Sequence, residues 1–203
     1  MIAIVDYGVG NLFSLKSSFA AIGEDVTVTS DPEVISAADR VVLPGVGAFE
    51  DAIAKLRESG LDKVILSEAE KGKPLLGICL GMQMLFDKSY EYGEHMGLGL
   101  INGAVKPIKG EVSEDLKIPH IGWNPLKMST PKDPLFKYIN EGDCVYFVHS
   151  YYATECDGYV IATAEYGKDL TAAVRNGNVY GAQFHPEKSG KVGLNILKAF
   201  CEL

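Results

Sequence analysis

Two short stretches carry side chains that could perform covalent chemistry. The first is Gly77-x-Cys79-x-Gly81, which follows an apolar run and precedes a helical pattern. It is the thiol counterpart of the Gly-x-Ser-x-Gly turn, in which glycines let the chain reverse tightly and present the middle side chain at the edge of a sheet. A cysteine at the start of a helix also lies at the positive end of the helix dipole, which favours the thiolate. The alternative is a core cysteine, since cysteine is among the most buried residue types.

The second stretch is His185-Pro186-Glu187, directly after the last predicted strand. Residues two apart in an extended segment project to the same side, and the proline disfavours helical angles at the histidine before it. A carboxylate beside an imidazole orients the ring and stabilises its charged form, as the third member of a nucleophilic triad does. Alone, the stretch is more typical of a surface turn with a solvated ion pair. Together with Cys79 it favours a Cys-His-Glu site.

Such a site would work by nucleophilic catalysis. His185 would hold Cys79 as a thiolate, and the sulfur would attack a carbonyl carbon to form an acyl-enzyme. The oxyanion that develops then needs hydrogen-bond donors. The candidates are the backbone N–H of Leu80 and a backbone N–H of the turn Gly45-Val46-Gly47. The alternative for this turn is a simple strand-to-helix connection.

The other three histidines are weaker candidates for the base. His149 lies in an apolar run without a carboxylate two residues away, so we expect a partly buried histidine with satisfied hydrogen bonds. His95 and His120 have no cysteine near them in the sequence, although sequence distance alone does not exclude them.

Alternating strand and helix patterns are expected to position these residues. In the first half, short apolar runs alternate with apolar residues at helical spacing, which is typical of a mostly parallel sheet with helices on both faces. Asn11 is the candidate N-cap of the first helix. Gly8 and Gly10 could begin a dinucleotide-binding loop, but Phe13 stands where the third glycine is needed, so this alternative is weak. The predicted strands cover 2–6, 25–29, 40–43 and 74–78, and the helical patterns cover 12–22, 31–33, 49–60 and a segment that begins at 61.

The second half is richer in strand patterns. The polar stretch 87–99 is predicted to be a loop, and Asn176-Gly177 is a hairpin signal. We therefore expect an α/β fold with a smaller antiparallel region in the C-terminal half, and no linker divides the single domain expected over residues 1–203. The predicted strands cover 104–108, 119–128, 144–153, 159–165, 170–175 and 179–183, and a last helix covers 190–203.

The composition limits the classes of function. The 203 residues are 47% hydrophobic and carry a net charge of −8, which argues against a nucleic-acid partner. No leader pattern and no run of about 18 apolar residues is present, so we expect a cytosolic protein with no membrane contact. The four cysteines, at 79, 144, 156 and 201, fit neither a zinc site nor a disulfide scaffold, so we expect free thiols and no metal.

The order and spacing of three motifs resemble those of the class I glutamine amidotransferases. These motifs are 44–47 (Pro-Gly-Val-Gly), 77–83 (Gly-Ile-Cys-Leu-Gly-Met-Gln) and 185–187 (His-Pro-Glu). The resemblance implies a flavodoxin-like fold and glutamine hydrolysis by Cys79, His185 and Glu187, without a cofactor. Within the class, the segments 6–11, 119–124, 147–151 and 185–189 are similar to the glutaminase subunits of imidazole glycerol phosphate synthases.

This narrower resemblance implies a partner and further site residues. The partner would be a TIM-barrel cyclase subunit, which forms a heterodimer and uses the ammonia to make imidazole glycerol phosphate and an aminoimidazole carboxamide ribotide in histidine biosynthesis. The oxyanion turn would stay misaligned until the partner binds its substrate, so the isolated subunit would hydrolyse glutamine poorly. Carried over by position, glutamine would contact Gly45, Gly47, Gln83, Glu91, Ser150 and Tyr151, and the cyclase would contact Asn11, Trp123, Tyr146 and Lys188.

Each of these carried-over roles has an alternative. Glu91 could be a solvated loop charge, Trp123 a core residue and Lys188 a surface charge. For the whole chain the rival functions are a glutaminase for another pathway, a stand-alone cysteine hydrolase of γ-glutamyl peptides and a catalytically silent binding module.

Overall fold

A five-stranded parallel sheet combines four strands from the first half of the chain with one strand from near its C-terminus. The computed structural model describes all 203 residues. Its parallel strands lie in the order β2-β1-β3-β4-β13, and strands β1, β4 and β13 are buried along their whole length, as expected for a sheet covered on both faces. The strands are β1 (Ile2–Val5), β2 (Val26–Thr29), β3 (Arg40–Leu43), β4 (Leu75–Ile78) and β13 (Val179–Ala182).

Four antiparallel strands extend the same sheet beyond β13, in the order β12-β11-β8-β9. Asn176 pairs with Val179, so the predicted hairpin forms with Gly177 and Asn178 as its two loop residues, one position later than the Asn-Gly signal. Gly177 has φ +59, which suits glycine. The strands are β12 (Asp169–Asn176), β11 (Val160–Glu165), β8 (His120–Met128) and β9 (Cys144–His149).

A second sheet lies beside the large one, in the order β10-β7-β5-β6. Its strands are β5 (Phe86–Ser89), β6 (His95–Met96), β7 (Ile101–Pro107) and β10 (Tyr151–Thr154). The prediction that 87–99 is entirely loop was therefore wrong. The polar strand β5 forms because it pairs with β7 on one side and β6 on the other, and such tertiary pairing outweighs local propensity.

The expected strand 144–153 is interrupted at Ser150, where the chain passes from one sheet to the other. Strand β9 pairs with β8 in the large sheet, whereas β10 pairs with β7 in the small one. This change of sheet brings residues 149–151 to the edge of the parallel strands, beside the end of β4.

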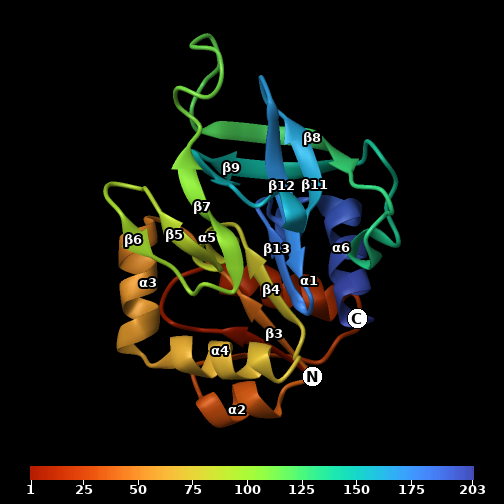
Figure 1. The fold of residues 1–203 in the computed structure, drawn as a ribbon. Helices are drawn as coiled ribbons and strands as arrows, with labels where there is room; N and C mark the ends of the chain where they lie inside the picture. Colours follow the sequence, from red (N-terminus) through yellow and green to blue (C-terminus); the bar gives the residue numbers. More distant parts are fainter.

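Helices cover both faces of the large sheet (Figure 1). One core contains Ile35, Phe49 and Leu61 from α2, α3 and α4. The other contains Phe19 of α1 and Phe200 of α6. The expected α/β architecture is confirmed. The helices are α1 (Leu12–Ala21), α2 (Pro32–Ala37), α3 (Phe49–Glu58), α4 (Leu61–Glu70), α5 (Leu80–Met84) and α6 (Gly190–Cys201), with short 3₁₀ turns η1 (Pro134–Phe136), η2 (Asp157–Tyr159) and η3 (Pro186–Lys188).

Two smaller expectations concern helix length and the first helix cap. None of the helices has the length and apolar character needed to cross a membrane. Asn11 occupies the N-cap position of α1, as predicted, but its side chain makes no capping hydrogen bond.

Candidate active site

Cys79 is the single residue between β4 and α5, at the end of the central parallel strands. Its backbone has φ +55 and ψ −112, an unfavourable conformation for a residue with a side chain. The strand-turn-helix prediction is thus confirmed. The flanking glycines are required by close contact: a Cβ on Gly77 would lie 2.7 Å from the Gly81 carbonyl oxygen, and a Cβ on Gly81 would lie 1.9 Å from the Leu43 carbonyl oxygen.

His185 and Glu187 emerge from the neighbouring strand at the same end of the sheet. Ile78 of β4 is in register with Ala182 of β13, so the residues that follow the two strands lie side by side. His185 Nδ1 is 2.8 Å from Glu187 Oε1, and the two side chains are 3% and 1% exposed. The imidazole and the carboxylate therefore meet, as expected, but Glu187 lies in the 3₁₀ turn η3 and not on the extended segment that the sequence predicts.

The electrostatics of His185 favour its charged form. Burial lowers the pKa of His185, but hydrogen bonds with the Cys79 thiol and the Glu187 carboxylate outweigh burial and raise that pKa from 6.5 to about 9. At neutral pH the ring therefore carries a proton beside the sulfur. This arrangement suits a thiolate–imidazolium pair.

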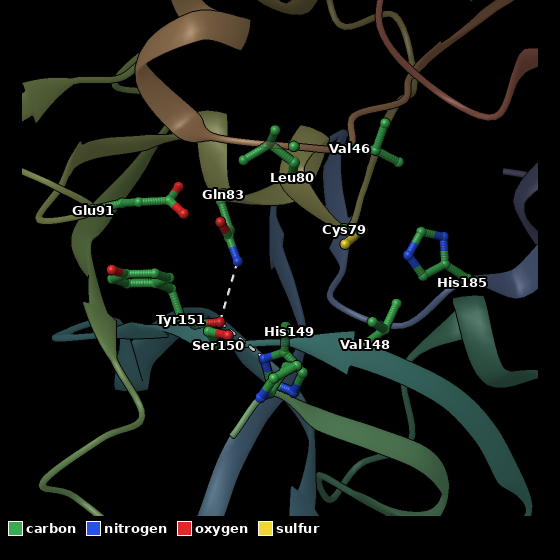
Figure 2. A pocket seen from close by; sticks show the side chains of 12 residues that line it. Val46, Cys79, Leu80, Gln83, Glu91, Val148, His149, Ser150, Tyr151 and His185 are labelled. Atoms are coloured by element: carbon green, nitrogen blue, oxygen red, sulfur yellow. Dashed lines mark hydrogen bonds between the residues drawn. The ribbon is translucent and has the colours of Figure 1, made fainter. Parts of the chain in front are cut away.

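A cavity of about 300 Å³ opens over the Cys79 sulfur (Figure 2). Cys79 is only 8% exposed, less than the open presentation expected of the elbow, but its sulfur faces this cavity. Figure 2 shows Cys79 and His185 on one side of the space and Glu91 and Tyr151 on the other. The lining residues are Val46, Gly47, Cys79, Leu80, Gln83, Glu91, Pro119, Val148, His149, Ser150, Tyr151 and His185.

The turn proposed for the oxyanion lies directly against the elbow. A Cβ on Gly45 would be 2.6 Å from the Gly81 nitrogen, so Gly45 supports the turn from behind and does not line the cavity. The backbone N–H groups of Val46, Gly47 and Leu80 make no hydrogen bond within the chain. All three residues line the cavity, so these groups remain the candidate oxyanion donors.

The far side of the cavity holds two further polar groups. Glu91 is half-buried and accepts a 2.7 Å hydrogen bond from the Phe49 N–H at the start of α3, and burial raises the pKa of Glu91 despite that bond. Gln83 Nε2 donates to the Tyr151 carbonyl oxygen at 3.2 Å and to Gln183 Oε1 at 3.0 Å. Both amide protons of Gln83 are thus engaged, which leaves its Oε1 for a ligand.

Two of the other histidines, His149 and His120, form hydrogen bonds that support the wall of the cavity. His149 Nδ1 lies 2.8 Å from the Tyr151 carbonyl oxygen, and His149 Nε2 lies 3.0 Å from His120 Nδ1. Burial lowers the pKa of His149 to about 4, so this ring is neutral and holds the 149–151 segment. The expectation of a satisfied histidine is confirmed, although the ring is almost fully buried. The fourth histidine, His95, is not among the residues that line the cavity, and its Nε2 lies 3.8 Å from Glu50 Oε2.

An exposed aromatic patch lies on the outer side of His185. Trp123 is 63% exposed, so the core alternative for this residue was wrong. Its ring centroid lies 4.8 Å from that of Tyr146, and Lys188 Nζ lies 5.7 Å from the Tyr146 ring. Three of the four residues predicted to face the partner therefore lie together: Trp123, Tyr146 and Lys188. Asn11 lies at the start of α1, next to Phe13, which is 82% exposed.

Sequence reasoning missed two buried residues beside the reacting groups. Tyr7 donates a 2.7 Å hydrogen bond to the Pro44 carbonyl oxygen. Gln183 approaches the Cys79 sulfur. Neither carries a local signal, because its partner is distant in the sequence. Gln183 lies two residues before His185, just after the end of β13, and this spacing was the one available hint. No three His, Cys, Asp or Glu side chains converge as metal ligands.

Comparison with known proteins gives concordant results. The family model described as "Glutamine amidotransferase class-I" matches residues 3–202. The chain is 48% identical to the "Imidazole glycerol phosphate synthase subunit HisH" of Syntrophotalea carbinolica, with both chains covered completely. It is 46% identical to the protein of the same name in Wolinella succinogenes, again with complete coverage of both.

Solved structures resemble the whole chain as well. A "Crystal structure of glutamine amidotransferase" superposes with a TM-score of 0.77 at 20% identity and covers 100% of this chain and 98% of that one. A "Structure of PurLQS from Thermotoga maritima" superposes with a TM-score of 0.77 at 21% identity and covers 99% and 97%. These identities support the fold alone, and the fold class expected from the sequence is confirmed.

Proposed function

The chain belongs to the class I glutamine amidotransferase family, and we propose that it is the glutaminase subunit of an imidazole glycerol phosphate synthase, with its 203 residues acting as one domain. The observation that carries this proposal is the position of His185, which lines the same cavity as Cys79 and lies 2.8 Å from Glu187 Oε1 through its Nδ1. The four free thiols are in keeping with a cytoplasmic location.

The first half-reaction would release ammonia. The Cys79 thiolate attacks the side-chain amide carbon of glutamine, and a C–S bond forms. Backbone N–H groups of Leu80 and of the 45–47 turn stabilise the oxyanion, and losing one such donor typically costs about 2.7–4 kcal/mol. Protonated His185 gives its proton to the amide nitrogen, and the C–N bond breaks. The products are a glutamyl thioester on Cys79 and ammonia.

The second half-reaction would restore the thiolate. Neutral His185 takes a proton from water as the water oxygen attacks the thioester carbon. The C–S bond then breaks, glutamate leaves, and Cys79 and His185 return to the thiolate–imidazolium pair. Glu187 keeps the imidazole oriented through both steps and stabilises its charged form.

Substrate recognition would use the far side of the cavity. Glu91 supplies a carboxylate, and Gln83 presents its free Oε1, so both accept hydrogen bonds from the α-ammonium group of glutamine. Ser150 and Tyr151 follow the change of sheet and line the same wall. Gly47 lines the same cavity, and its φ of +91 favours glycine at this position of the turn.

The partner would be a cyclase subunit of TIM-barrel fold that receives the ammonia. Relatives at 46–48% identity carry the name of a synthase subunit, which implies a complex with another chain. Trp123, Tyr146 and Lys188 form the exposed patch next to His185, and aromatic residues are enriched at interface cores. We propose that this patch, together with Asn11, binds the cyclase.

A coupled synthesis assay tests the proposal. With the cyclase and its nucleotide substrate, the wild-type chain is expected to support synthesis from glutamine, and Cys79→Ala only from added ammonium. We also expect weak glutaminase activity alone and strong stimulation by the loaded cyclase. Full unstimulated turnover would favour the stand-alone γ-glutamyl hydrolase, and productive pairing with a different synthase would favour another pathway.

A further inference from the structure

A buried amide side chain touches the proposed nucleophile. Gln183 follows β13 and is completely buried. Its Nε2 lies 3.8 Å from Cys79 Sγ, within hydrogen-bonding distance for a sulfur acceptor. Its backbone N–H bonds to the Ala172 carbonyl oxygen at 2.9 Å, so the residue is fixed by the sheet. Gln183 does not line the cavity, and it reaches the sulfur from behind.

The hydrogen-bond network determines which end of the Gln183 amide faces the sulfur. The carbonyl oxygen of Tyr151 can only accept, so the nitrogen of Gln83 must point toward it. The same nitrogen then donates its other proton at 3.0 Å to Gln183, which must present its oxygen there. The NH₂ group of Gln183 is consequently directed at Cys79. The Tyr151 carbonyl group, 32 positions before Gln183 in the sequence, thus determines through Gln83 that the Gln183 NH₂ group faces the sulfur.

We propose that Gln183 is a catalytic residue that stabilises the Cys79 thiolate by donating an N–H hydrogen bond to the sulfur. The role refines the proposed glutaminase, since the thiolate is needed as the attacking group and again as the leaving group of the thioester. Gln183 is neutral and cannot lose its donor at working pH, unlike His185, which gives its proton away in the first half-reaction and regains one in the second. A hydrogen bond to a charged acceptor is also stronger than one between neutral groups.

The test is the pH dependence of Cys79 alkylation by iodoacetamide, followed by mass spectrometry of the Cys79 peptide so that exposed Cys144 does not interfere. Gln183→Met keeps similar length and removes the donor. We expect the midpoint of the alkylation profile to rise by about one pH unit. In the cyclase complex, kcat for glutamine is expected to fall about tenfold with little change in KM, because Gln183 does not contact the ligand space.

Two further variants make the result decisive. Gln183→Glu keeps the oxygen that accepts from Gln83 but removes the NH₂ group, so the midpoint should rise at least as far as in the methionine variant. Thr171→Val is the matched control, since it removes a buried hydroxyl on the neighbouring strand β12 without touching Cys79, and its midpoint should equal that of the wild type.

An unchanged midpoint in folded Gln183→Met or Gln183→Glu would overturn the proposal, whether or not kcat falls. A rise in KM with an unchanged midpoint would assign Gln183 only the task of holding Gln83. Alkylation needs neither glutamine nor the cyclase, so this result is independent of whether the chain proves to be a glutaminase.

Discussion

The hydroxyl of Tyr7 donates a 2.7 Å hydrogen bond to the carbonyl oxygen of Pro44, in the buried space behind Cys79. The same proline also packs against Gly10, where a Cβ would lie 3.0 Å from the Pro44 Cβ. The loop that leads to Asn11 is therefore joined to the turn that carries the oxyanion donors. A partner that contacts Asn11 would have a short physical route to that turn.

Tyr7→Phe tests whether this bond positions the turn. The variant leaves the Pro44 oxygen buried without its donor, which typically costs about 1–3 kcal/mol. We expect the glutaminase kcat of the cyclase complex to fall about tenfold, while Cys79 alkylation keeps its wild-type profile because the thiolate is untouched. Steady-state kinetics and alkylation measure the two effects. Unaltered kcat would show that the turn holds its position without Tyr7.

Gly81→Ala tests the packing of the elbow against the oxyanion turn. The added methyl group would lie 1.9 Å from the Leu43 carbonyl oxygen, and the atoms it meets belong to the Leu43–Pro44 backbone, which cannot move aside as a flexible side chain could. We expect destabilisation by about 3 kcal/mol or more in urea unfolding. Gly158→Ala is the control, since a Cβ there meets nothing within 4 Å, and it should be nearly neutral. Equal stability of the two variants would contradict the close packing.

Glu187→Gln tests the charge state of His185 through the pH dependence of stability. Burial lowers the pKa of His185, but hydrogen bonds with Cys79 and Glu187 raise it to about 9, above its ordinary value of 6.5. The proton on His185 therefore contributes stability that is fully present below about pH 6.5 and is lost as the pH rises through 9.

Because the variant lacks the Glu187 charge, the wild type should lose more unfolding free energy than the variant between pH 6.5 and 9, by on the order of 1–2 kcal/mol. Urea unfolding at several pH values measures the difference, with the exposed Glu165→Gln as the control. Parallel stability curves for wild type and Glu187→Gln would contradict the assigned role of Glu187.

Trp123→Ala tests the aromatic patch as the cyclase-binding surface. A buried interface tryptophan commonly contributes about 2 kcal/mol or more, which corresponds to roughly 30-fold in Kd. Calorimetric titration with the cyclase should show that loss. Met96→Ala, an exposed apolar residue on β6 of the small sheet, should bind as tightly as wild type. If the two variants bind alike, the patch is not the interface.

The sequence predicts the parts of the site that depend on local geometry. Gly77-x-Cys79-x-Gly81 describes one turn, and His185 and Glu187 are two residues apart at the start of the short turn η3, so residues close in sequence form each part of the site. The alternation of strands and helices in the first half is equally local. These features appear in the structure as expected.

The features that sequence reasoning missed depend on contacts between distant segments. Gln183 and Cys79 are 104 positions apart, and Tyr7 and Pro44 are 37 apart, so no local pattern links them. The sequence of β5 predicts a loop, because its polar residues form a strand only through pairing with β7. The break at Ser150 has the same origin, since β9 and β10 pair in different sheets.

Covalent labelling with the glutamine analogue diazo-oxo-norleucine, followed by intact-mass and peptide mapping, tests most directly whether Cys79 is the glutamine-reactive nucleophile. In the cyclase complex we predict a single adduct on Cys79, protection by excess glutamine and no adduct in Cys79→Ala. An unlabelled wild-type chain, or an adduct that maps to exposed Cys144 and persists in Cys79→Ala, would contradict the assignment.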